Sequence, residues 1–102
     1  WTVASLNPMT GIYASITRRT RDGKNPNGWF PEEKITVQDA LKSYTINNAY
    51  AAFWEGKTGS IVAGKYADFV VHSENLLKAE SEKILNSKVL RTVVGGRDFL
   101  FD

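Results

Sequence analysis

The chain has 102 residues, 42% hydrophobic and 24% charged, values typical of a globular protein rather than a disordered or membrane-embedded one. Its net charge of +2 at pH 7 does not by itself predict an acidic partner. The chain contains no cysteine, which excludes disulfides and thiolate metal sites. It shows neither a signal peptide nor an apolar run long enough to span a membrane. A cytoplasmic location fits these observations. Because the sequence opens on Trp1 rather than methionine, we expect it to be a piece of a longer protein.

A helix is predicted over residues 8–19. Asn7 favours the N-cap position, and Pro8 fits the first turn because its missing N–H would have no partner there. An apolar stripe follows at helical spacing: Met9, Ile12, Tyr13 and Ile16. Four turn signals then make residues 20–34 a long connection, which is usually functional or mobile. Trp29 and Phe30 in its middle indicate that it packs against another part of the protein.

Two more helices are predicted before the pattern changes. Thr36 begins a run that resembles a capping box, so a helix should extend from there to about residue 44. Residues 46–53 form a second, alanine-rich helical stretch that ends near Gly56.

After residue 56 the pattern favours strands. Residues 59–62 are a short strand candidate, 67–73 have the apolar, β-branched character of a buried strand, and 81–85 form one short helical turn. Gly95-Gly96 is a strong hairpin signal between strands at 88–94 and 97–101. The fold class predicted is therefore α+β, with helices followed by a small antiparallel sheet.

The segment 59–71, GSIVAGKYADFVV, resembles the C-terminal signature of the amidohydrolase superfamily, which is roughly G-x-I-x-x-G-x-x-A-D-hydrophobic-V-V. The structural signature residues in this chain are Gly59, Gly64, Ala67, Asp68, Gly95 and Gly96. Upstream, residues 40–49 resemble the superfamily's A-L…T-x-N-x-A helix. The motifs at 7–19 and 27–32 resemble the YtcJ-like, N-substituted-formamide-deformylase-like branch of amidohydrolase family 3.

The resemblance implies a metal-dependent hydrolase with a TIM-like barrel and a composite β-sandwich built from both chain ends. Residues 1–56 would be the end of the barrel, its last helices and the loop 20–34. Residues 57–102 would be the C-terminal strands of the sandwich. The family's metal ligands are histidines early in the barrel, sometimes a modified lysine, and an aspartate directly before a residue like Trp1. We therefore expect no catalytic residue and no metal ligand in this chain, and a divalent metal, zinc by preference, in the full-length parent.

The resemblance also implies what the parent does. It would hydrolyse non-peptide C–N bonds in a small-molecule amide or formamide-type substrate, and this fragment alone would be inactive. The alternative is a non-catalytic structural or interaction module derived from the same fold. The expected partners are the remainder of the parent or other copies of this chain, with neither nucleic acid nor membrane. Trp1 and Ser5 would leave the last barrel strand at the face that holds the active site, where they line the substrate pocket or serve packing.

Other candidate residues have plainer interpretations. His72 is the only histidine, and a metal site needs several converging ligands, so we expect a structural or surface role. A basic cluster lies next to Trp29 and Phe30: Arg18, Arg19, Arg21 and Lys24. It could bind nucleic acid by phosphate contact and stacking, but a helix end followed by a polar loop produces the same pattern. Asp68 is expected to accept hydrogen bonds from the N–H groups of the turn before it.

Overall fold

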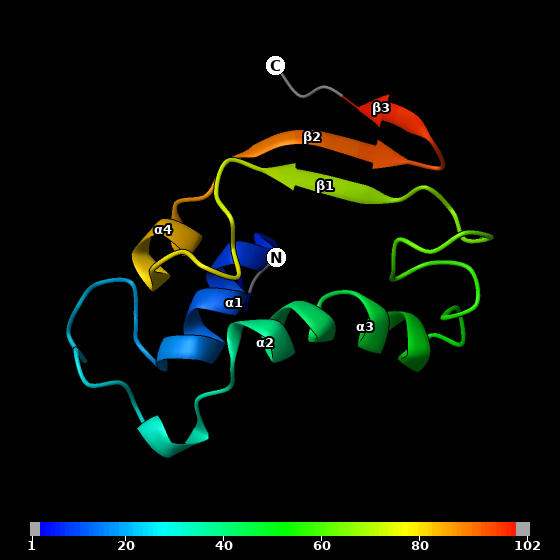
Figure 1. Cartoon of the computed structure of the whole chain (residues 1–102). Helices are drawn as coiled ribbons and strands as arrows, with labels where there is room; N and C mark the ends of the chain where they lie inside the picture. The colour runs from blue at the N-terminus through cyan, green and yellow to red at the C-terminus, as the bar shows by residue number, and fades with distance from the viewer. Residues whose placement is uncertain (1–2, 100–102) are drawn as a thin grey trace. The chain divides into compact units, whose positions relative to one another are not determined.

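The computed structural model describes residues 3–99. Its elements, in chain order, are α1 (Pro8–Thr17), the 3-10 helix η1 (Pro31–Glu33), α2 (Val37–Ser43), α3 (Ile46–Ala51), β1 (Phe69–His72), α4 (Ser81–Leu85), β2 (Val89–Val94) and β3 (Arg97–Phe99) (Figure 1). The predicted α+β class with a small antiparallel sheet is confirmed. Contacts within the chain form two compact units: the first unit is 1–41 with 74–87, and the second unit is 42–73 with 88–102. The boundary expected at residue 56 concerns the parent's domains and stays a prediction, as does the barrel origin of the helices.

Helix α1 starts as predicted and ends two residues early. The Asn7 side chain accepts a hydrogen bond from the Met9 N–H (3.0 Å), which caps the helix. At the other end Arg18 adopts φ 58° and ψ 20°, and its N–H donates to the Ala14 carbonyl (2.7 Å). A left-handed residue at this position turns the chain out of the helix, so the predicted extension to residue 19 is wrong.

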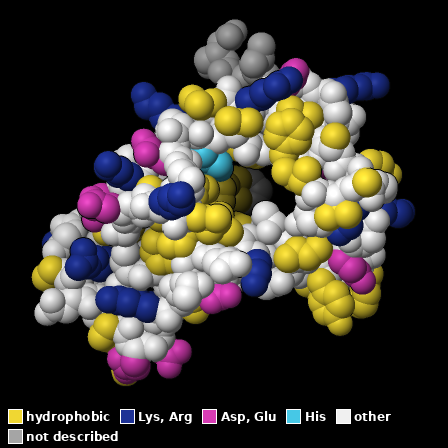
Figure 2. Space-filling model, viewed as in Figure 1, with side chains coloured by type: hydrophobic (Ala, Val, Ile, Leu, Met, Phe, Trp, Pro, Cys, Tyr) yellow, Lys and Arg dark blue, Asp and Glu magenta, His cyan; other side chains and the backbone are white. Residues whose placement is uncertain are grey.

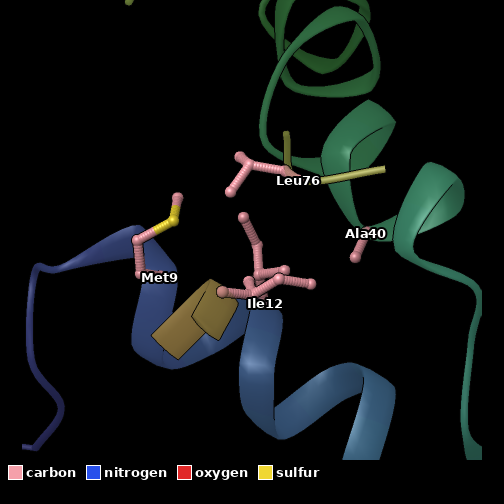
Figure 3. Packing of buried hydrophobic residues seen from close by; sticks show 5 residues of the cluster. Met9, Ile12, Ala40 and Leu76 are labelled. Carbon is pink, nitrogen blue, oxygen red and sulfur yellow. The ribbon is translucent and has the colours of Figure 1, made fainter. Parts of the chain in front are cut away.

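The core of the first unit is a small apolar cluster. Its buried members are Met9, Ile12, Ala40, Leu76 and Ile84. Figure 3 shows the labelled side chains from α1, α2 and the segment before α4 directed toward one another. The two isoleucines are 1% and 0% exposed, and burying a side chain of this size stabilises a fold by about 1.5–3 kcal/mol. The short helix predicted at 81–85 is confirmed as α4, which packs on α1.

The caps of α2 and α3 follow from local sequence. The Thr36 hydroxyl accepts from the Asp39 N–H (3.1 Å) and donates to the Asp39 carboxylate (2.6 Å), so the predicted N-cap is confirmed. Helix α3 ends at Ala51, two residues before the predicted end. Phe53 takes φ 59° there, and the Trp54 N–H donates back to the Ala49 carbonyl (2.8 Å), the bond pattern that closes many helices.

The sheet lies in the second unit and has the order β1-β2-β3, with both pairs antiparallel. Gly95 and Gly96 have φ values of 56° and 77°, which confirms the predicted hairpin between β2 and β3. The strand predicted at 67–73 forms only at Phe69–His72. It is an edge strand, and Val70 is 46% exposed, so its predicted burial is wrong.

The strand predicted at 59–62 is also wrong, because those residues form a loop. The Tyr66 N–H donates to the Lys57 carbonyl (2.8 Å) and closes this loop on itself. Ile61 is 82% exposed. Among residues 3–99, the sheet consists of β1, β2 and β3, and residues 59–62 pair with none of them. Apolar, β-branched residues favour a strand only where a neighbour completes the hydrogen-bond ladder.

Candidate functional site

The segment before α1 was predicted to line a substrate pocket. Ser5 is exposed there, and its hydroxyl accepts a hydrogen bond from the Asn7 N–H (3.1 Å). Val3 is 97% exposed and Leu6 is 74% exposed, so apolar side chains flank the serine without covering it. Trp1 lies outside the described residues. A pocket-lining role for Trp1 and Ser5 stays a prediction.

The signature around Asp68 ties two loops to the sheet. One carboxylate oxygen of Asp68 accepts from the Gly95 N–H (2.7 Å), and the other accepts from the Thr58 hydroxyl (3.0 Å). The Gly96 N–H donates to the Ala67 carbonyl beside it (3.1 Å). The expected partners of Asp68, the N–H groups of the preceding turn, are therefore wrong: it binds the distant hairpin turn and a side-chain hydroxyl. Its role in this geometry is structural.

The loop between α3 and β1 depends on Gly59. This glycine has φ +84°, and an added Cβ would lie 2.7 Å from the Ala49 Cβ and 3.0 Å from the Ile46 Cα. Both a positive φ and a close approach to α3 are thus required at this position. Gly64 also has a positive φ (+93°), but its Cβ position is open.

His72 is half-buried in β1, and burial lowers the pKa of its imidazole below the usual value. The neutral form is then dominant at pH 7. Within residues 3–99 no three side chains of the metal-binding types His, Cys, Asp and Glu converge. These residues therefore do not fit the metal centre that the resemblance implies for the parent, and no step of a metal-dependent reaction can be assigned to them.

Tyr13 and Glu82 form a polar link between α1 and α4 that sequence reasoning missed. The Tyr13 hydroxyl donates to the Glu82 carboxylate (3.0 Å). Burial raises the pKa of Tyr13, the carboxylate beside it raises it further, and Arg19 opposes the change. The sequence separation of 69 positions between the partners explains why no local pattern revealed the contact.

Part of the predicted basic cluster lines a concave surface in the described part of the chain. Arg18, Arg19, Lys24 and Trp29 line an open cleft of about 560 Å³, and Arg21 does not. The Arg18 guanidinium lies 5.4 Å from the centre of the Trp29 ring. Trp29 and Phe30 contact each other edge to face at 4.7 Å, yet they are 66% and 53% exposed. The loop itself packs as predicted, since the Trp29 N–H donates to the Arg18 carbonyl (2.9 Å) and Gly28 lies against the end of α1.

A family model described as the amidohydrolase family matches residues 1–98. The chain belongs to the amidohydrolase family. This amidohydrolase chain is 40% identical over 97 residues to the protein LONG AFTER FAR-RED 3 of Arabidopsis thaliana, covering 95% of the chain and 16% of that relative. It is 32% identical over 92 residues to an N-substituted formamide deformylase of Arthrobacter pascens, covering 90% of the chain and 16% of the relative. It is 25% identical over 95 residues to the putative amidohydrolase YtcJ of Bacillus subtilis, covering 93% and 18%.

The amidohydrolase chain thus spans only about a sixth of the length of these curated relatives. No solved structure matches it. Among residues 3–99, no helix is both long enough and apolar enough to cross a bilayer. The predicted recognition of this family, including its deformylase-like and YtcJ-like relatives, is confirmed.

Proposed function

We propose that this chain is the C-terminal part of a metal-dependent amidohydrolase that hydrolyses non-peptide C–N bonds in amide or formamide-type small molecules. The observation that carries the proposal is the family match over residues 1–98. A relative named N-substituted formamide deformylase supports the choice of bond and substrate class. The parent's helices would close a TIM-like barrel, and its last strands would join a composite β-sandwich.

The metal, with zinc as the preferred ion, would be held by polypeptide outside this chain. The types of side chain that this sequence contains support this proposal. A zinc site needs three or four converging nitrogen, sulfur or carboxylate ligands, whereas this chain has one histidine and no cysteine. The segment before α1, with Trp1 and Ser5, would contribute to the wall of the substrate pocket.

An exposed apolar face of the sheet supports the proposal that another protein surface binds this chain. Alternation along β2 and the register with its neighbours place four apolar side chains on the same face: Val70, Leu90, Val94 and Phe99. Their exposed fractions range from 46% to 60%. Figure 2 shows hydrophobic side chains at the surface in the region of the sheet. Apolar faces of this kind usually meet another surface. We propose that the remainder of the parent hydrolase covers this one, or a second copy when the chain is alone.

The alternative function is a non-catalytic interaction module of the same fold. The relative at 40% identity, LONG AFTER FAR-RED 3, has a name that denotes no reaction, and this keeps the alternative in view. The two proposals make opposite predictions for a chimera in which this chain replaces the homologous segment of an active relative.

The experiment uses the N-substituted formamide deformylase, of which this chain covers 16%. Three proteins are compared in a deformylation assay with zinc present: the intact relative, the relative without its homologous segment, and the chimera. We expect activity in the intact relative and the chimera only. The isolated 102-residue chain should show no turnover, and zinc should leave its thermal unfolding unchanged.

Two results would contradict the proposal. Turnover by the isolated chain would mean that the catalytic residues lie within it. A chimera that folds and binds zinc like the intact relative, but does not deformylate, would favour the interaction module. Zinc content and circular dichroism of the chimera distinguish that case from simple misfolding.

A further inference from the structure

The cleft beside Trp29 is built around a firmly held arginine. Arg18 takes a left-handed conformation at the end of α1. Its carbonyl accepts from the Trp29 N–H (2.9 Å) and from the Asn25 side-chain amide (3.1 Å), while its Nε donates to the Trp29 carbonyl (3.0 Å). The first two bonds fix the Arg18 backbone, and the Nε bond orients its guanidinium. Among residues 3–99 the two terminal nitrogens bind no acceptor, so they are left for a ligand.

The loop that forms the other wall is equally constrained. Gly28 has φ +82°, and a Cβ added there would lie 2.5 Å from the Thr17 carbonyl oxygen, so the loop lies directly against the end of α1. The Asn25 carboxamide oxygen accepts from the Thr20 N–H (2.7 Å), and its amide donates to the Arg18 carbonyl (3.1 Å). A cleft whose walls are held this way loses little conformational freedom when a ligand binds.

Positive charges outnumber negative charges among the residues that line the cleft. Lys24 is paired with Asp22 (3.3 Å), and hydrogen bonds, the first of them from the Thr20 hydroxyl, lower the pKa of the Asp22 carboxyl, so this carboxylate is ionised at pH 7. Arg18 and Arg19 make no ion pair with a carboxylate among the residues that the structure describes. The cleft therefore holds a surplus of positive charge, concentrated at its two arginines.

A flat apolar surface adjoins this charge. Trp29 is 66% exposed, although the Arg18 guanidinium lies over its ring, 5.4 Å from the ring centre. Aromatic faces bind planar groups by stacking, and a guanidinium fork binds carboxylates and phosphates through two parallel hydrogen bonds. The cleft is open to solvent, so both surfaces are accessible to a small ligand.

We propose that this cleft binds a small organic anion, with its carboxylate or phosphate on the terminal nitrogens of Arg18 and its flat apolar part against Trp29. This inference is independent of the proposed hydrolase function, because it uses only residues of the first unit. A nucleic-acid strand is less favoured, since only three residues of the basic cluster line the cleft and one of them, Lys24, is paired with Asp22.

The test titrates the 102-residue chain with phenyl phosphate, benzoate, inorganic phosphate and benzyl alcohol, following N–H correlation NMR spectra. The Trp29 indole and Arg18 Nε signals should shift in a saturable way with both aromatic anions. The Trp54 indole, which belongs to the second unit, should not shift. Inorganic phosphate should bind more weakly because it cannot stack, and benzyl alcohol should produce no shift at the same concentrations. Tighter binding of phenyl phosphate than benzoate assigns a phosphate ligand, and the reverse assigns a carboxylate.

Matched variants separate a specific site from general attraction. Arg18→Gln should weaken binding of phenyl phosphate about tenfold or more, because it removes a charge-assisted bidentate contact. Arg21→Gln removes the same charge from the same loop, outside the cleft, and should change affinity by less than about twofold. Asp22→Asn keeps the acceptor of the Thr20 bond and removes the opposing charge, so it should tighten binding. A gain of affinity cannot result from misfolding, which keeps the test informative if Arg18→Gln disturbs the loop.

Absence of a saturable shift with either aromatic anion at millimolar concentration would overturn the proposal. Equal losses in Arg18→Gln and Arg21→Gln would also overturn it, because affinity would then follow net charge alone. A third refuting result is that Asp22→Asn leaves binding unchanged or weakens it.

Discussion

Substitution of Gly59 by alanine tests how the signature loop is attached to α3. The added Cβ would meet the Ala49 Cβ at 2.7 Å, the Ile46 Cα at 3.0 Å and the Thr45 carbonyl oxygen at 3.2 Å. Two of these three neighbours are backbone atoms, which cannot rotate away. Ala49 is 6% exposed, so its methyl group has little space into which it can move. The loop or the helix must therefore shift.

The expected cost has two parts. A positive φ at a residue with a Cβ costs about 1–2 kcal/mol, and overfilling a packed site costs about 1–3 kcal/mol. Alanine has less conformational entropy than glycine in the unfolded chain, which offsets this destabilisation by about 0.4–1 kcal/mol. Gly59→Ala should accordingly lower the free energy of unfolding by about 1–5 kcal/mol.

Two other glycines of the same unit separate these contributions. Gly64 has a positive φ (+93°) and an open Cβ position, so Gly64→Ala should cost only about 1 kcal/mol. Gly56 has neither a positive φ nor a neighbour within 4 Å, so Gly56→Ala should be neutral or slightly stabilising. Urea unfolding followed by circular dichroism measures all three against the unchanged chain. If Gly59→Ala costs no more than Gly64→Ala, the close approach to Ala49 contributes nothing and the reasoning fails.

Three further predictions concern the polar links and the exposed sheet. Asp68→Ala should lower the free energy of unfolding by about 1–2 kcal/mol, because the Gly95 N–H loses a charged acceptor. Asp68→Asn is the control and should cost less. An unchanged urea midpoint in both variants would refute the structural role of Asp68. Tyr13 has a pKa raised from 10.0 in the folded chain, so its contribution to stability is complete below that pH and is lost as the pH rises through the raised value; Tyr13→Phe should flatten this alkaline decline in the melting temperature. The isolated chain should self-associate, and Leu90→Lys should reduce its mass by light scattering, whereas a monomeric unchanged chain would contradict the proposed use of the sheet face.

Local chemistry was readable from the sequence. The cap by Asn7, the cap by Thr36 and the hairpin turn at Gly95-Gly96 each depend on residues within three positions of one another. Such contacts are decided by the neighbouring residues alone. For the same reason α4 could be predicted although it is only five residues long.

Features that depend on distant residues were missed. The loop at 59–62 has the composition of a strand, but no strand lies beside it in the described part of the chain to complete a ladder. Asp68 was correctly expected to satisfy its carboxylate, yet one partner is 27 residues away. The cleft shows the same limit: the sequence reveals the arginines and Trp29, but only the fold of the loop between them separates Arg21 from the others.

The two compact units are interleaved along the polypeptide, since each consists of two separate stretches of sequence. No single cut between residues 41 and 88 can therefore release either unit whole, and any terminal truncation that reaches this region removes pieces of both. To study one unit alone, its two stretches would have to be rejoined by a new linker, in the manner of a domain rebuilt after an insertion is deleted. Deletion mapping of an activity in this protein would report damage to the fold before it reported the position of a site.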